Sequence, residues 1–280
     1  YLLKYGIPPR DAEATADQVD LTKYYNHTLF EDAYRVKNQN SDSAWLWRRL
    51  PIGLTRFNDV LFDVRGIIRL SARAFAGAVF SRPLPVEVTG IEVNRQATWL
   101  HFLHTVVAER RIPDGEEVGY YQIHYTDGET RRLSIRYGRD VVIMVDNEFA
   151  VPTHAALAWG EGRYEGHKAL YHSSWENPRP QVAITAVDFV STNSVPAPFL
   201  VALSLESDGE DSASDAQAIS RRALHRAVYT RGQTELTRSA VERDSLRALE
   251  AEPAAAELIY RRAEVLLATG KTEESLALVK

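Results

Sequence analysis

The spacing of apolar residues changes near Glu206, and this change constrains the fold more than any other feature of the sequence. Before Glu206 apolar residues recur at every second position, whereas after it they recur at every third or fourth position. A strand buries residues i and i+2 and a helix buries i, i+3 and i+4, so one packing mode cannot serve both stretches. The sequence therefore predicts a mainly β body followed by a helical tail.

Composition narrows the class of protein. The 280 residues, 45% of them hydrophobic, suffice for one sizeable core and a smaller appendage. The net charge is −5 and arginine is interspersed with acidic residues, so nucleic acid is not an expected partner. No apolar run approaches the roughly 20 residues of a transmembrane segment. The absence of cysteine excludes disulfides, thiolate metal sites and thiol nucleophiles.

The chain begins Tyr1-Leu2-Leu3-Lys4, with neither a methionine nor the apolar region of a signal peptide. We therefore expect further residues to precede Tyr1 in the gene product, as a cleaved export signal, an anchor or a trimmed segment. Export is compatible with this start, and we predict an extracytoplasmic location, periplasmic or at the cell surface. A membrane-associated complex fits this prediction.

Residues 1–53 are polar and irregular, and Pro8-Pro9 favours extended chain over helix. The arm also contains aromatic residues that are too apolar to be wholly solvated: Tyr24, Tyr25, Trp45 and Trp47. We expect this arm to lie along the sandwich and cover part of it, with ligand stacking as the alternative.

Residues 54–206 contain the β pattern. Residues 61–70 predict one or two strands, with Gly66 at a bulge or a close backbone approach. Residues 99–107 are apolar on both faces, which predicts a central strand. Further strands are expected at residues 141–145, 169–173, 182–190 and 199–205. This series without interleaved helices favours an antiparallel β-sandwich.

A hairpin is the clearest local prediction, because residues 121–125 and 133–137 alternate around the turn residues Asp127-Gly128. The expected core face comprises Tyr121, Ile123, Tyr125, Leu133, Ile135 and Tyr137, and the expected outer face comprises Gln122, His124, Arg132 and Arg136. His124 and Arg136 are candidates to bind an anionic or hydroxylated ligand, although a solvated sheet face explains them equally well.

Four motifs follow one another in residues 8–206: Phe62-Asp63-Val64-Arg65-Gly66-Ile67, Leu100-His101-Phe102-Leu103-His104, Trp175-Glu176-Asn177-Pro178, and Asp188-Phe189-Val190-Ser191 with Ala197-Pro198-Phe199-Leu200. Their order and spacing resemble an uncharacterised bacterial β-sandwich module, a jelly roll of the galactose-binding-like kind. That module is appended to anti-sigma-type regulators, kinases and repeat proteins. It has no assigned reaction and no agreed ligand. Related sandwiches often bind sugars on a concave face or in edge loops, sometimes with a structural calcium ion.

An acidic linker is expected at residues 207–215, and the tail occupies residues 216–280, with helices at 216–231 and 234–249. The run at residues 258–279 resembles a tetratricopeptide repeat. Pro253 begins the unit, Ala263 is the small contact residue and Gly270 forms the turn, while Ser275 stands where alanine is usual.

Fewer than two full repeats fit in the tail, whereas about three are needed to bury their own apolar faces. The tail must therefore dock on the sandwich, on a second copy or on another protein. Tyr260 and Leu267 are the candidate partner-binding residues. A plain helical hairpin that closes one end of the sandwich is the competing interpretation.

Catalytic chemistry is not indicated. His101 and His104 fall on opposite faces of one strand and cannot chelate a metal as a pair, and His104 is expected to be a hydrogen-bonded core residue. Asp114, Glu116 and Glu117 cluster in a turn, which does not predict the facing carboxylates of a glycosidase. No nucleophile elbow, phosphate loop or zinc helix is present. We predict no catalytic residue, no metal ligand and no cofactor.

Trp159 and Trp175 are the remaining candidates, because loop aromatics can stack on sugars or anchor a protein interface. Trp175 is equally well explained as a structural plug. The favoured function is a non-catalytic scaffold subunit that attaches to a larger assembly through its sandwich and its tail. The alternative is a carbohydrate-binding module with an aromatic platform around Trp159. A hydrolase with two carboxylates in a pocket is the third hypothesis.

Overall fold

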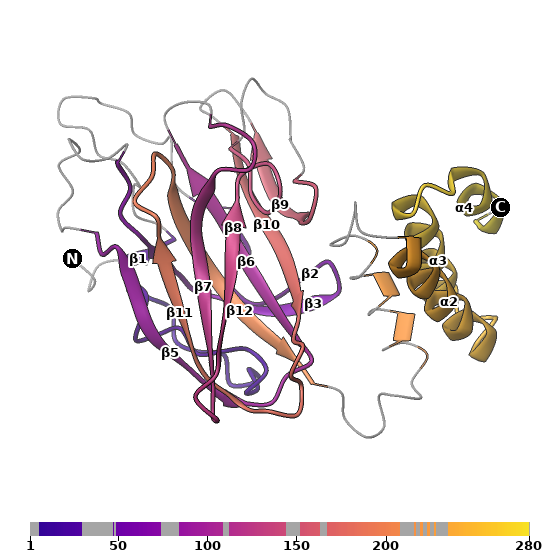
Figure 1. Ribbon diagram of the computed structural model, residues 1–280, viewed down its shortest axis with the longest axis horizontal. Coiled ribbons are helices and arrows are strands. Elements are labelled where there is room, and N and C mark those ends of the chain that lie inside the picture. The colour runs from indigo at the N-terminus through magenta and orange to yellow at the C-terminus, as the bar shows by residue number, and fades with distance from the viewer. Residues whose placement is uncertain are drawn as a thin grey trace. The chain divides into compact units, whose positions relative to one another are not determined.

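The computed structural model describes residues 6–29, 47, 49–73, 84–108, 112–143, 152–162, 167–207, 216, 219–220, 223–224, 227 and 235–279. The chain divides into two compact units, Tyr1–Ser207 and Asp208–Lys280. The first is built from antiparallel sheets and the second from helices (Figure 1). The predicted fold class, a mainly β sandwich followed by a small helical tail, is confirmed.

Every strand pair in the described part of the first unit is antiparallel. One sheet has the order β1 (His27–Thr28), β4 (Gly66–Arg69), β12 (Ala197–Glu206), β6 (Trp99–Val107), β10 (His167–Glu176) and β9 (Ala156–Gly162). The second has the order β5 (Glu87–Arg95), β11 (Ile184–Ser191), β7 (Glu117–Tyr125) and β8 (Thr130–Arg136). A separate hairpin pairs β2 (Gly53–Phe57) with β3 (Val60–Val64).

An aromatic stack joins the two larger sheets. The ring of Tyr121 on β7 lies between Phe102 on β6 and Phe189 on β11, at centroid distances of 4.0 and 5.1 Å. His104 is buried beside this stack, with Nδ1 3.0 Å from the Tyr121 hydroxyl and Nε2 2.8 Å from Ser173 Oγ. The prediction that His104 is a hydrogen-bonded core histidine is confirmed, and His101 points to the opposite face of β6.

A third layer covers the other face of the six-stranded sheet. Leu29 and Trp47 from the arm and Phe62 from the β2–β3 hairpin pack with Leu103 and Leu170 of the sheet in one apolar cluster. This layer explains why all nine residues of β6 are buried. The described arm residues thus lie against the sandwich, while Trp45 falls outside the described residues.

The predicted β7–β8 hairpin is present, with Tyr121 opposite Leu133 and a positive φ of 86° at Gly128. The β2–β3 hairpin is an addition that the sequence pattern did not reveal. Its two turn residues, Asn58 and Asp59, have φ values of 46° and 66°, which suit a tight hairpin turn.

The strand expected at residues 141–145 is wrong for its described part, because Val141 forms only an isolated bridge with Tyr137. Residues 144 and 145 lie outside the described residues. Conversely, β5 and β9 form where no strand was expected. Glycines interrupt both stretches, Gly90 in β5 and Gly160 in β9, and they obscure the alternation by which a strand is predicted.

A buried ion network fastens the arm to the β2–β3 hairpin. Arg65 Nε donates to both carboxylate oxygens of Asp63, at 2.9 and 2.8 Å, and these two side chains are only 1% and 2% exposed. Two arm residues complete the network: Asp20 Oδ1 accepts from Arg65 Nη2 at 2.7 Å, and Arg10 Nη1 donates to Asp63 at 3.1 Å. Burial is the largest single influence on Arg65 and lowers its pKa, but Asp63, Tyr25 and Asp20 together outweigh it, and the guanidinium pKa is raised.

Gly66 follows this network and leaves room for the arm. A Cβ at this position would lie 2.7 Å from Cγ of Tyr25 and 2.8 Å from Cδ1 of Ile7, closer than real Cβ contacts. The tyrosine hydroxyl donates to the carbonyl of Val201 at 3.1 Å. Of the two alternatives expected at Gly66, a bulge or a close approach, the structure shows a close approach, made by side chains of the arm to the Gly66 backbone.

In the second unit the described helices are α2 (Glu235–Ala251), α3 (Ala256–Ala268) and α4 (Thr272–Leu278), and residues 216, 219–220, 223–224 and 227 are also helical. Gly270 forms the turn between α3 and α4 with a φ of 89°. Ser275 Oγ on α4 donates to the carbonyl of Ala263 on α3 at 2.8 Å. The small side chain at position 263 thus lets α3 and α4 approach closely. None of the described helices is long and apolar enough to cross a bilayer.

We expect Asp63→Asn to lower the free energy of unfolding by about 3–5 kcal/mol, because the buried Arg65 guanidinium loses its counter-charge. The double variant Asp63→Leu with Arg65→Met should lose less unfolding free energy than Asp63→Asn, since it leaves no buried charge in this pair. Urea melts measure both. The matched control is Glu92→Gln, which removes an exposed ion pair with Lys23 and should change stability by less than about 1 kcal/mol. Equal losses in Asp63→Asn and Glu92→Gln contradict the expectation.

Burial lowers the pKa of His104 from 6.5 to about 3. Between these values the unfolded chain binds one proton that the folded chain does not, so stability must fall as the pH falls. The slope from this one group is about 1.4 kcal/mol per pH unit. His104→Gln keeps hydrogen-bonding atoms near Tyr121 and Ser173 and should remove this slope. Urea melts of both proteins at pH values from about 4 to 6.5, which lie between the two pKa values, measure how the free energy of unfolding changes with pH. Identical pH slopes for the wild type and His104→Gln would count against a neutral buried His104.

Candidate functional site

The six candidate residues belong to two units and three surfaces. His124 and Arg136 lie on the four-stranded sheet, and Trp159 and Trp175 lie on the six-stranded sheet. Tyr260 and Leu267 lie on α3 of the helical unit. Each surface is therefore described separately.

The structure does not bring His124 and Arg136 together. Both face outward as predicted, but His124 pairs with Thr130 and Arg136 pairs with Glu117, at opposite ends of the β7–β8 hairpin. Six residues along a strand correspond to about 20 Å. A small ligand cannot contact both side chains at once, so the two residues define separate places on this face.

His124 is held by a carboxylate that sequence reasoning did not single out as a site residue. Its Nε2 lies 2.6 Å from Oδ2 of Asp188 on β11, and Oδ1 of Asp188 accepts the backbone N–H of Gly90 on β5 at 2.8 Å. The histidine and aspartate side chains are 35% and 18% exposed. Gln122 lies opposite Asp188 in the sheet register. Two strands, β7 and β11, thus present an oriented group of hydrogen-bonding side chains, held in part by a backbone N–H of β5, and such a group suits a polar ligand.

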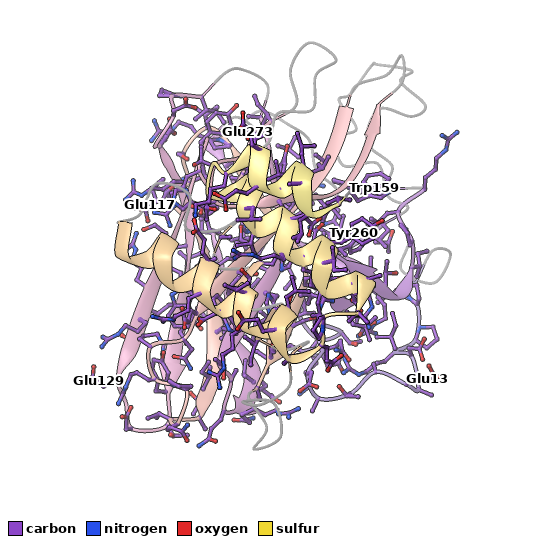
Figure 2. The ribbon with its side chains drawn as sticks, turned by 90° about the vertical axis from the view of Figure 1, so that its right-hand side faces the viewer. Glu13, Glu117, Glu129, Trp159, Tyr260 and Glu273 are labelled. Carbon is purple, nitrogen blue, oxygen red and sulfur yellow. The ribbon has the colours of Figure 1, made fainter. Side chains whose placement is uncertain are left out.

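Arg136 is engaged within the protein. Its Nη2 lies 3.6 Å from Glu117 Oε2, and its Nη1 donates to the carbonyl of Gly115 at 3.0 Å. Glu117 also accepts a hydrogen bond from Arg132, which raises the pKa of that guanidinium. Arg132 in turn lies over the ring of Tyr120 at 3.7 Å (Glu117 is labelled in Figure 2). This end of the sheet is an internally satisfied ion network.

Trp159 and Trp175 lie on strands, so their expected placement on loops is wrong. Trp159 is on β9, half-buried, with its ring 5.6 Å from that of Trp47 in the arm (Figure 2). Trp175 is on β10 opposite Leu100 and is also half-buried. Asn177 follows it and shapes the turn as expected, donating to the carbonyl of Ala97 at 2.8 Å. Both tryptophans offer only part of their ring surface to solvent.

The helical unit exposes an apolar surface. Tyr260 is 60% exposed and Leu267 is 49% exposed. They are seven residues apart, which is about two turns, and so they lie on one side of α3 (Tyr260 is labelled in Figure 2). Within the described residues the exposed large apolar side chains are Leu246, Tyr260, Leu267, Leu276 and Val279 in the helical unit and Ile52 and Val86 in the first unit. Exposed apolar surface is thus concentrated in the smaller unit.

A polar cluster inside the first unit was also missed. His101 on β6 and His172 and Ser174 on β10 meet on the face that the third layer covers. Only the pairing of β6 with β10, which no local pattern reveals, brings them together. No group of three or more His, Asp or Glu side chains converges as a metal site anywhere in the described residues.

Comparison with models of known protein families and with curated proteins finds no significant match.

Proposed function

We propose that this protein is a non-catalytic assembly subunit in which the β unit is a rigid body and the helical unit binds another protein. The supporting observation is the exposed apolar stripe of Tyr260 and Leu267 on α3, with Leu276 and Val279 on and after α4. Burying one such side chain is worth about 1.5–3 kcal/mol. Contiguous exposed apolar surface on a soluble protein is typical of protein contacts, membrane contacts and ligand grooves.

The spacing of the stripe indicates the shape of the partner. Side chains seven residues apart on a helix form a narrow ridge, which fits an amphipathic helix lying along it. The first turn of α4, the next helix along the chain, carries two exposed carboxylates, Glu273 and Glu274, the second of them 3.8 Å from Lys271. A partner helix with basic residues beside its apolar face would therefore complement this surface in charge.

The test compares the full chain with Tyr260→Lys plus Leu267→Lys, both at exposed helix positions where lysine is well tolerated. The tagged proteins are purified from the native source, and their complexes are sized by light scattering and cross-linked for mass spectrometry. We expect the wild type to carry a partner whose cross-links map to α3, and the variant to lose it while its stability changes by less than about 0.5 kcal/mol. Glu250→Lys, an exposed charge change on α2, is the control and should keep the partner. A wild type that elutes as a bare monomer, or a variant that retains the partner, contradicts the proposal.

The alternative is a carbohydrate-binding module, and one observation favours it. Gln122, His124 and Asp188 form a row of part-exposed side chains that can donate and accept hydrogen bonds on the outward face of the four-stranded sheet. Planar polar side chains held by their neighbours suit sugar hydroxyls. Under this alternative the ligand contacts this row and not the half-buried Trp159.

For the alternative we expect Gln122→Ala plus His124→Ala to abolish binding on a glycan array without loss of stability. Trp159→Ala, by contrast, should lower the free energy of unfolding by about 1–3 kcal/mol, because it leaves a gap beside Trp47. Ser134→Ala on the neighbouring strand β8 is the control. If the wild type binds no glycan, or the double variant binds as the wild type does, the sugar alternative is wrong.

A further inference from the structure

Three side-chain atoms converge at the buried cluster on the covered face of the six-stranded sheet. Ser174 on β10 lies directly opposite His101 on β6, and His172 is on the same side of β10 two residues earlier. Ser174 Oγ is 2.8 Å from His101 Nδ1 and 3.1 Å from His172 Nε2. The two ring nitrogens are 3.1 Å apart. The three atoms thus form a nearly equilateral triangle.

Hydrogen bonding does not account for all three sides of this triangle. If both ring nitrogens carry protons, both can donate to the hydroxyl, but the two N–H groups then face each other. If only one nitrogen carries a proton, that N–H and the hydroxyl supply two hydrogen bonds and the third contact has no proton of its own. At most two of the three short contacts are therefore hydrogen bonds. Two hydrogen bonds with an N···N van der Waals contact are one arrangement of the three atoms, and a cation that accepts one lone pair from each is the other.

The dimensions suit a metal ion. Ligand atoms bound to a tetrahedral zinc ion at about 2.0–2.1 Å lie about 3.3 Å from one another, roughly 0.2–0.5 Å more than the observed separations of 2.8–3.1 Å. On the far side of the imidazole, His101 Nε2 lies 3.5 Å from Oε2 of Glu206. A carboxylate on the second ring nitrogen is the usual arrangement around a histidine that binds a metal, because it fixes the ring and its tautomer.

We propose that His101 Nδ1, His172 Nε2 and Ser174 Oγ form a binding site for a divalent transition metal of the zinc class, with Glu206 orienting His101. Two imidazoles select zinc, copper or nickel over calcium or magnesium, which prefer oxygen ligands. Both histidines are fully buried and Ser174 is part-exposed, so the ion reaches the site from the serine side and water completes its coordination. The site joins β6, β10 and the end of β12, and it is independent of the partner proposed for the helical unit.

The first experiment titrates the metal-free full chain with Zn²⁺ by calorimetry and with Co²⁺ by its visible absorption. We expect one ion per chain. His172→Phe, which places a ring of similar size beside Phe62, should weaken Zn²⁺ binding by more than about 100-fold. His154→Ala removes a histidine elsewhere on the first unit and should bind as the wild type does. Absence of stoichiometric binding by the wild type, or equal binding by His172→Phe, overturns the proposal.

Two further variants test the metal site if His172→Phe does not fold. Ser174→Cys supplies a thiolate at the third corner and should tighten Zn²⁺ binding at least about tenfold, with a sulfur charge-transfer band in the Co²⁺ spectrum. Glu206→Gln should weaken Zn²⁺ binding about tenfold through loss of the carboxylate that orients His101. If both variants fold and bind Zn²⁺ with wild-type affinity, the cluster is a hydrogen-bonded core feature and the metal site does not exist.

Discussion

The buried contact between Asp63 and Arg65 is the constraint on which the rest of the first unit depends. Charges this deep are costly to desolvate, and they are tolerated because the charges are paired and each nitrogen of the guanidinium and each oxygen of the carboxylate has a hydrogen-bond partner. Two of these partners, Arg10 and Asp20, belong to the arm. The ion network therefore specifies where the arm lies, and the arm with the β2–β3 hairpin keeps the second face of the six-stranded sheet out of water. The sandwich has three layers for this reason.

Local patterns predicted the elements whose signals are local. Alternation around Asp127-Gly128 defined the β7–β8 hairpin and its outward residues, and the change of period near Glu206 separated strands from helices. The two-residue turn at Asn58 and Asp59 was missed although both residues tolerate positive φ. Glycines hid β9, and the strand expected at residues 141–145 had an apolar run but pairs only through one isolated bridge, Val141 with Tyr137, in its described part.

The candidate sites were predicted only as far as the direction in which a side chain points. The alternation of side chains along each strand placed His124 and Arg136 on the outer face. It could not show that they lie at opposite ends of a hairpin or that Asp188 holds the histidine. The contact between His101 and His172 is harder still to predict from the sequence, because these residues are 71 positions apart and come together only through the pairing of β6 with β10. Register between distant strands is a property of the whole sheet, and no window of sequence contains it.

The contact between Tyr25 and the carbonyl of Val201 spans 176 positions, and the backbone N–H of Val19 bonds to Leu203 over a similar distance. During synthesis the arm leaves the ribosome long before the strand that receives it. The arm can meet Asp63, Arg65 and β4 early, but its contacts with Val201 and Leu203 must wait until β12 has emerged, and the sheet cannot complete its covered face sooner. Long loops of this kind slow folding, because their closure entropy is lost before the contacts repay it. The order of translation thus makes β12 the last strand on which completion of the β unit depends.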